Sequence, residues 1–176
     1  SQVMENWCYE PEALALFAKH YETGEIIPQQ YVEKIKESAS FLEGMATLRQ
    51  LSFGILDMTY HGKSQTIEDV KAFEKQAMEG TSLYPDVAEN CMSTSFSHIF
   101  QGGYSSGYYS YKWAEVLDAD AFAYFQEKGI FNKEVANKFK DNVLSKGGTE
   151  LPMELYKKFR GQEPKVEALL KRAGLL

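Results

Sequence analysis

The chain has 176 residues, of which 44% are hydrophobic and 14% aromatic, and it carries a formal net charge of -6 with a pI near 5.2. This length and hydrophobic content suit one folded domain with a sizeable core and exclude a chain that is disordered by composition. The acidic balance and the lack of a long basic stretch argue against a nucleic-acid partner. No run of about 18 apolar residues is present to span a bilayer, so we expect no membrane partner.

Helical spacing of apolar residues dominates the sequence and strand signals are scarce, so we predict an all-α fold of several helices. In chain order, the expected helices cover residues 11–21, 28–38, 41–60, 66–78, 107–128, 132–145, 153–160 and 164–172. Thr66 and Asn132 are the expected N-caps of two of them. Residues 80–97 are expected to form a loop. We find no internal repeat or linker, so a single helical unit is the simplest interpretation.

Two cysteines, Cys8 and Cys91, are too few for a disulfide framework, and neither belongs to a Cys-x-x-Cys motif. We therefore expect free thiols, which favours a reducing compartment.

The strongest chemical signal is a run of tyrosines and glycines over residues 102–113, preceded by His98. In a helix, Tyr104, Tyr108 and Tyr111 fall at i, i+4 and i+7, so their hydroxyls would line one face. Phenols and an imidazole can donate hydrogen bonds to an oxyanion or a peptide carbonyl. The alternative is a tyrosine-rich core helix whose hydroxyls meet buried carbonyls.

The other side of the same segment has the spacing of a buried stripe, formed by Tyr109, Trp113, Val116 and Leu117. Glycine is costly inside a helix and permits positive φ, so we expect a mobile loop through about Gly107 and a helix after it.

Several stretches resemble, in the same order, the C-terminal part of the thimet oligopeptidase and peptidyl-dipeptidase family of zinc metallopeptidases. These stretches are residues 96–104, 113–122, 144–148, 152–155 and 159–164, and residues 1–7 resemble the segment that follows the third zinc ligand of that family. The resemblance extends over essentially the whole chain.

The resemblance implies a role for each residue of the cluster. His98 and Tyr111 would stabilise the tetrahedral intermediate of peptide hydrolysis, opposite a zinc ion that polarises the scissile carbonyl. Tyr104 and Tyr108 would contact substrate, with structural packing as the alternative for Tyr108. Gly102 and Gly103 would belong to a flexible, substrate-binding loop that closes on the peptide.

The family binds zinc through a His-Glu-x-x-His helix and a downstream glutamate, and this sequence lacks that motif. Its three histidines are His20, His61 and His98, and no two of them are four positions apart. We therefore expect a C-terminal fragment, with residues 1–176 as one helical region of the catalytic domain. The Zn²⁺ of the intact enzyme would have its ligands outside this chain, and the fragment alone would be inactive. Its expected partners are short peptides and the missing N-terminal part, and its expected location is cytoplasmic.

Four further residues need an interpretation. Glu5 would orient a zinc ligand or be an exposed helix carboxylate. Arg160 would bind a peptide carboxylate or, more commonly for such an arginine, tie a helix end to a neighbouring acid. His20 and His61 have no motif support and are expected to be surface or capping histidines.

The fuller matches at residues 113–122 and 159–164 favour the peptidyl-dipeptidase branch, which releases dipeptides from the C-termini of short peptides. The alternatives are an endo-cleaving oligopeptidase of the same family, a helical peptide-binding module without catalysis, and a purely structural helical domain.

Overall fold

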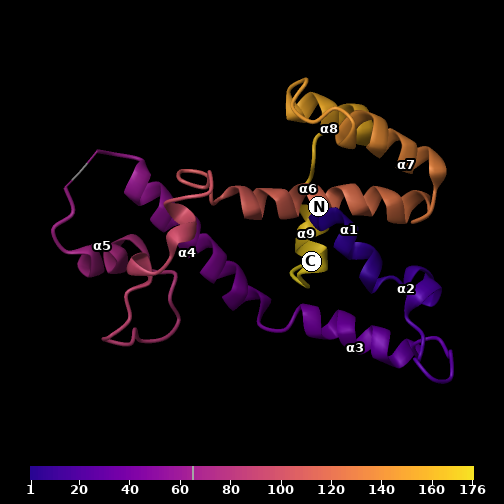
Figure 1. Cartoon of the computed structure of the whole chain (residues 1–176), viewed down its shortest axis with the longest axis horizontal. Helices are drawn as coiled ribbons and strands as arrows, with labels where there is room; N and C mark the ends of the chain where they lie inside the picture. Colours follow the sequence, from indigo (N-terminus) through magenta and orange to yellow (C-terminus); the bar gives the residue numbers. More distant parts are fainter. Residues whose placement is uncertain (65) are drawn as a thin grey trace. The chain divides into compact units, whose positions relative to one another are not determined.

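The computed structural model describes residues 1–64 and 66–176, and Figure 1 shows that they form helices joined by loops. Within this part of the chain there is no β-strand, and a single isolated antiparallel bridge joins Lys19 and Ile26. The prediction of an all-α fold is confirmed. No helix within the described ranges is both long and apolar enough to cross a membrane.

The chain divides into two compact units, which we call unit 1 (residues 1–41 and 114–176) and unit 2 (residues 42–113). Unit 1 contains α1 (Gln2–Glu5), η1 (Asn6–Tyr9), α2 (Pro11–Phe17), α3 (Gln29–Ala39), most of α6 (Ser110–Lys128), α7 (Lys133–Phe139), the π-helical η4 (Lys140–Leu144), α8 (Pro152–Arg160) and α9 (Glu167–Arg172). Unit 2 contains α4 (Glu43–His61), α5 (Val70–Ala77), the 3₁₀ helices η2 (Met92–Thr94) and η3 (Ser97–Ile99), and the first turn of α6.

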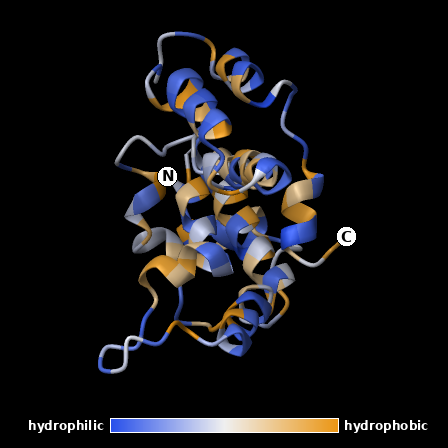
Figure 2. Cartoon of the chain, turned by 90° about the vertical axis from the view of Figure 1, so that its right-hand side faces the viewer, coloured by the Kyte–Doolittle hydropathy of each residue, from blue (hydrophilic) through white to orange (hydrophobic). Residues whose placement is uncertain are grey.

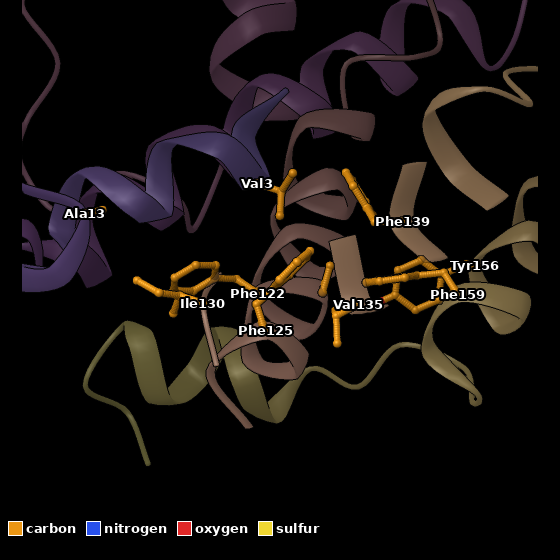
Figure 3. Packing of buried hydrophobic residues seen from close by; sticks show 10 residues of the cluster. Val3, Ala13, Phe122, Phe125, Ile130, Val135, Phe139, Tyr156 and Phe159 are labelled. Atoms are coloured by element: carbon orange, nitrogen blue, oxygen red, sulfur yellow. The ribbon is translucent and has the colours of Figure 1, made fainter. Parts of the chain in front are cut away.

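The core of unit 1 is aromatic and is built around α6 and α8. Phe159 is 1% exposed, and its ring lies 5.1 Å from that of Phe139 and 6.2 Å from that of Phe125. Trp7 packs edge-on against Phe122 and Phe125, with ring centroids 4.8 and 4.9 Å apart. Figure 3 shows Phe122, Phe125, Phe139 and Phe159 lying together, and the burial of this core is the main source of stability of unit 1.

Two aspartates of α6 are buried in unit 1, and each has hydrogen-bond donors. Asp120 Oδ2 accepts from the Tyr156 hydroxyl at 2.6 Å and from Arg160 Nε at 3.3 Å, while Arg160 also donates to Glu127 at 3.0 Å. Burial, and then the hydrogen bond to Asp120, raise the pKa of Tyr156. Arg160 therefore ties the end of α8 to neighbouring acids, which confirms that interpretation of it.

Asp118, the other buried aspartate, joins the N-terminal and C-terminal segments of unit 1. Its Oδ1 accepts from Asn6 Nδ2 at 3.2 Å, and Arg172 of α9 donates to both of its carboxylate oxygens. Paired in this way, a charged group can stay in the interior.

The core of unit 2 is smaller and consists of Phe53 and Leu56 from α4, with Ile99 and Tyr108. Leu56 and Ile99 have no exposed surface. These contacts attach the segment that carries His98 to the side of α4.

Most expected helices are present, with shifted ends. The expected N-cap Thr66 is wrong, because Asp69 caps α5 by accepting hydrogen bonds from the amides of Lys71 and Ala72 at 3.0 and 2.9 Å. The N-cap Asn132 is confirmed, since its Oδ1 accepts from the two amides at the start of α7. Helix α2 ends at Phe17 rather than at residue 21, and the chain then turns back through the Lys19–Ile26 bridge.

The expected buried stripe is wrong at Tyr109 and Trp113, whose side chains are 59% and 46% exposed. Helix α6 begins at Ser110, so Tyr108 and Tyr109 precede it and do not follow its phase. The buried face of α6 starts at Asp118. In Figure 2 the helices carry both hydrophobic and hydrophilic residues, as expected for elements with one buried face.

Replacing Phe159 by alanine is expected to lower the free energy of unfolding of the chain by about 3–5 kcal/mol, because it empties the centre of the aromatic core. Denaturant unfolding followed by circular dichroism measures the loss. The control is Phe131→Ala, which removes a side chain that is 53% exposed and should change stability by about 0.5 kcal/mol or less. Equal losses in the two variants would contradict the packing described here.

Candidate active site

His98 lies in η3, where its neighbour Ile99 is fully buried against the core of unit 2. The imidazole is partly buried, and aromatic rings surround it edge-on. Its ring centroid lies 4.6 Å from that of Tyr104, 5.5 Å from that of Tyr108 and 5.7 Å from that of Tyr111. The buried neighbour and the surrounding rings hold the imidazole in one orientation.

Tyr111 is the closest polar partner of this imidazole. Its hydroxyl lies 3.2 Å from His98 Nε2, and its ring stacks on that of Tyr104 with centroids 5.3 Å apart. The hydrogen bond with Tyr104, followed by desolvation, raises the pKa of Tyr111 to about 12. The phenol is therefore neutral, and able to donate, throughout the pH range in which most enzymes work.

Tyr108 differs from the other two tyrosines because its ring is buried. It is 8% exposed and packs against Phe53 and Phe96 in the core of unit 2. Burial raises the pKa of its phenol, an effect that the nearby Arg49 opposes. The hydroxyl donates to Gln50 Oε1 at 3.3 Å. Packing thus accounts for the ring of Tyr108, and contact with substrate stays a prediction.

The loop between His98 and Tyr111 has an exposed glycine turn in its first half and a hydrogen-bonded segment in its second half. Gly102 and Gly103 are exposed and have positive φ values of 75° and 82°, which favour glycine. After them, Ser105 Oγ donates to the carbonyl of Ile99 at 3.0 Å. The amides of Ser106 and Tyr108 donate to the carboxylate of Asp57, each at 2.9 Å.

A second carboxylate holds the segment that leads into His98. Glu74 of α5 accepts hydrogen bonds from the amides of Met92 and Ser93. Partial desolvation raises the pKa of Glu74, but the hydrogen bonds from Ser93, Met92 and Cys91 lower it by more, so its pKa lies below the ordinary value. The carboxylate is therefore ionised at neutral pH and fixes η2.

Two cavities border the aromatic cluster in unit 2. One, of about 630 Å³, is lined by residues 95–98 with Gln101, Gly102 and Tyr104. The other, of about 430 Å³, lies between α4 and the start of α6 and is lined by Tyr108, Tyr111 and apolar side chains that include Leu51 and Ile55. The polar tips of the cluster are therefore not sealed in a core.

The sequence profile of Peptidase family M3 matches residues 1–175 of the chain. The chain belongs to peptidase family M3. The resemblance inferred from its motifs is confirmed.

Named relatives of this M3 chain include both oligopeptidases and a dipeptidyl carboxypeptidase. Oligopeptidase A of Escherichia coli (strain K12) is 46% identical over 177 residues, and organellar oligopeptidase A of Arabidopsis thaliana is 43% identical over 185 residues. Dipeptidyl carboxypeptidase of Escherichia coli (strain K12) is 33% identical over 178 residues. These alignments cover 99%, 100% and 99% of the chain, but 26%, 23% and 26% of the relatives, so the chain spans about a quarter of their length.

Zinc is the metal expected for an M3 chain. Across residues 1–64 and 66–176, no group of three or more His, Cys, Asp or Glu side chains is arranged to hold a metal ion. The described residues do not fit a zinc site, and we derive no chemical step through the metal.

The remaining candidate residues do not belong to the His98 cluster. His20 is exposed, and its Nδ1 accepts hydrogen bonds from the amides of Glu22 and Thr23 within a turn, as expected for a surface histidine. Glu5 is exposed in α1, and its role near a metal stays a prediction. Cys8 and Cys91 are free thiols, as expected.

Sequence reasoning did not identify Asp57 and Gln50 as parts of this site. One signal was available: Asp57 directly follows Leu56 and is four positions after Phe53, on the face of α4 with the apolar core residues. A carboxylate at such a position requires buried donors. His61 is the last residue of α4, for which Gly62 is the C-cap, and its Nδ1 lies 2.8 Å from Asp57 Oδ1.

We expect the Tyr111 phenol to ionise later than an ordinary tyrosine. Its raised pKa favours the neutral phenol in the folded chain, so the stabilising effect is present below about pH 10 and is lost as the pH rises through about 12. Ultraviolet titration of phenolate should therefore give the same curve for wild type and Tyr111→Phe up to about pH 11.

Tyr104→Phe removes the main cause of this shift and should bring the ionisation of Tyr111 to lower pH. The Tyr104→Phe variant and the Tyr104→Phe/Tyr111→Phe double variant should then differ by one phenolate at about pH 11. Identical curves for these two variants would refute Tyr104 as the main cause of the raised pKa of Tyr111.

Proposed function

We propose that this M3 chain is the C-terminal, substrate-binding part of a zinc-dependent peptidase that hydrolyses short peptides. The observation that carries the proposal is the pairing of His98 with Tyr111 beside open cavities in unit 2. The imidazole lines one of these cavities and the phenol lines the other. A neutral phenol and an imidazole that are paired and each border a cavity are suited to hydrogen-bond a peptide carbonyl.

In the proposed reaction, His98 and Tyr111 act on the carbonyl oxygen of the scissile peptide bond. Negative charge accumulates on that oxygen as the tetrahedral intermediate forms, and donors that are already oriented stabilise it without reorganisation. Tyr111 is suited to this role because its raised pKa keeps the proton on the phenol. Binding requires the hydroxyl to exchange its present partners for the substrate oxygen, a change that is common between free and bound active sites.

The other tyrosines and the glycines are proposed to bind the peptide chain. Tyr104 lines the larger cavity together with Gly102, and the exposed Gly102–Gly103 turn is free of a bulky side chain where a substrate backbone would approach. Tyr108 would contact substrate through its hydroxyl only, because its ring is part of the core.

We propose further that the zinc ligands lie outside the 176 residues and that this chain needs the rest of a longer polypeptide for activity. The proposal is supported by the alignments, which cover about a quarter of the relatives, and by the lack of a His-Glu-x-x-His motif in the sequence. In that polypeptide, residues 1–176 would form one region of the catalytic domain. A cytoplasmic location stays a prediction.

For the mode of cleavage, we propose the oligopeptidase type rather than the peptidyl-dipeptidase type that the motifs favoured. The identity is 46% with an oligopeptidase A and 33% with a dipeptidyl carboxypeptidase, over similar lengths.

Tyr111→Phe in the longer enzyme is expected to lower kcat by about 10²–10³, with a much smaller effect on KM, because the lost hydrogen bond forms fully only in the transition state. Steady-state kinetics on a short fluorogenic peptide measure both constants. Tyr31→Phe, which removes the hydroxyl of a half-exposed tyrosine in unit 1, is the matched control and should leave both unchanged. Wild-type turnover in Tyr111→Phe would refute the assigned role.

The mode of cleavage is tested with peptides of about ten residues that have either a free or an amidated C-terminus. Internal cleavage predicts the same early products from both peptides, because the terminal carboxylate is not recognised. Mass spectrometry of early time points identifies the fragments. Successive release of dipeptides from the free peptide alone would support the peptidyl-dipeptidase type instead.

A further inference from the structure

Asp57 is a buried carboxylate to which the proposed reaction gives no role. It lies in α4 beside Leu56, and its side chain has no exposed surface. An isolated charge in such a position would be very unfavourable, so the donors that surround it determine why it can be there.

Backbone amides of the tyrosine loop supply two of these donors. Ser106 donates to Oδ1 and Tyr108 donates to Oδ2, and both distances are 2.9 Å. The two amides lie on either side of Gly107 and are 49 and 51 positions away from Asp57 along the chain. One carboxylate thus holds the loop at two points, which fixes its orientation as well as its position.

His61 supplies the third contact, from the next turn of α4. Its Nδ1 lies 2.8 Å from Asp57 Oδ1 and 2.9 Å from the carbonyl of the same residue. The imidazole is 25% exposed, whereas the carboxylate is fully buried. The ring therefore covers the carboxylate on one side and fixes its rotamer.

The backbone of the loop shows that these contacts hold an otherwise unfavourable conformation. Ser106 has a φ of 56°, in the left-handed region that non-glycine residues rarely adopt. A residue stays there when its surroundings determine the conformation, and the hydrogen bond to Asp57 is such a determinant. Gly102 and Gly103 reach positive φ without that cost.

We infer that Asp57 is a positioning residue that fixes the loop of residues 105–108, and through it the arrangement of Tyr104, Tyr108 and Tyr111 around His98. The inference deepens the proposed function and rests on it. The sequence predicted a mobile loop through Gly107. The contacts instead confine the free part to Gly102 and Gly103, so that any closure on a peptide moves the glycine turn and leaves the tyrosines in place.

A purely structural role for Asp57 is the competing explanation, and Asp120 shows what such a role looks like. Asp120 is also a buried aspartate in a helix, 3% exposed, but its oxygen accepts from the side chains of Tyr156 and Arg160 within unit 1. Asp57 instead binds loop backbone beside the candidate site. Asp120 is therefore the matched control for the loss of a buried carboxylate.

Amide hydrogen exchange of the unmodified chain tests the inference without any variant. Ser106 is an exposed residue, yet its amide should exchange slowly, at rates similar to those of α4, because its hydrogen points at a buried carboxylate. Gly102 and Gly103 should exchange close to the unprotected rate. Exchange of Ser106 as fast as that of Gly103 would overturn the inference.

Asp57→Asn tests the same contact by substitution. The amide group keeps the size of the carboxylate, but one of its two ends is a donor, so one loop amide loses its acceptor. Exchange at Ser106 or Tyr108 should accelerate by about tenfold or more, while the amides of unit 1 stay unchanged. Asp120→Asn should leave Ser106 and Tyr108 at wild-type rates. Equal effects of both variants on these amides would indicate general destabilisation and overturn the inference.

Kinetics of the longer enzyme separate positioning from general stability. Asp57→Asn should lower kcat/KM by about 10–100-fold, because a small displacement of the donors is costly. In a Tyr111→Phe background the same substitution should lower it by only about threefold or less, since its effect passes through that phenol. Additive losses would overturn the inference. Wild-type turnover in Tyr111→Phe alone would instead refute the proposed function, and the exchange of Ser106 would still decide the role of Asp57.

Discussion

The candidate site depends on how a short, glycine-containing loop is held against a helix without a regular strand or helix of its own. Asp57 satisfies this constraint with one side chain, because its two oxygens accept amides from both sides of Gly107. Its burial makes the contact stronger than it would be in water, since no solvent competes for the same donors. The positions of the phenols follow from this contact together with the packing of Ile99 and Tyr108 against α4.

Unit 2 holds the segments around His98 with two carboxylates, the buried Asp57 and the half-buried Glu74. Glu74 binds the amides of η2 on one side of His98, and Asp57 binds the loop on the other side. Each joins a helix to the backbone of a segment that forms no long helix of its own. The imidazole between them is thereby oriented by polar contacts and by the rings around it, and it still borders an open cavity. Such a combination is suited to a site that must be both rigid and accessible to a peptide.

The sequence was sufficient to predict the helical class, most helix positions and the grouping of His98 with the tyrosines, because apolar periodicity and caps are local signals. It failed where a residue's environment depends on distant partners. Tyr109 has helical spacing but precedes the helix, which starts only at Ser110. Trp113 lies within α6 but is exposed, because the buried face of that helix begins only at Asp118. Asp57 was not identified because its partners are about fifty residues away, and its apolar neighbours were the only local indication. The roles assigned to His98, Tyr104 and Tyr111 come from family resemblance. The structure adds that these side chains lie close together and border open cavities.

Unit 1 is discontinuous in the chain, and this has a consequence for how it folds. Trp7 packs on Phe122, so its core joins segments that are separated by the whole of unit 2. Closing so long a loop is entropically costly while the intervening chain moves freely, and the cost falls if that chain has already collapsed. The contacts inside unit 2 are shorter in sequence range, so we expect them to form sooner. Residues that never touch the aromatic core of unit 1 therefore help to set the rate at which that core assembles.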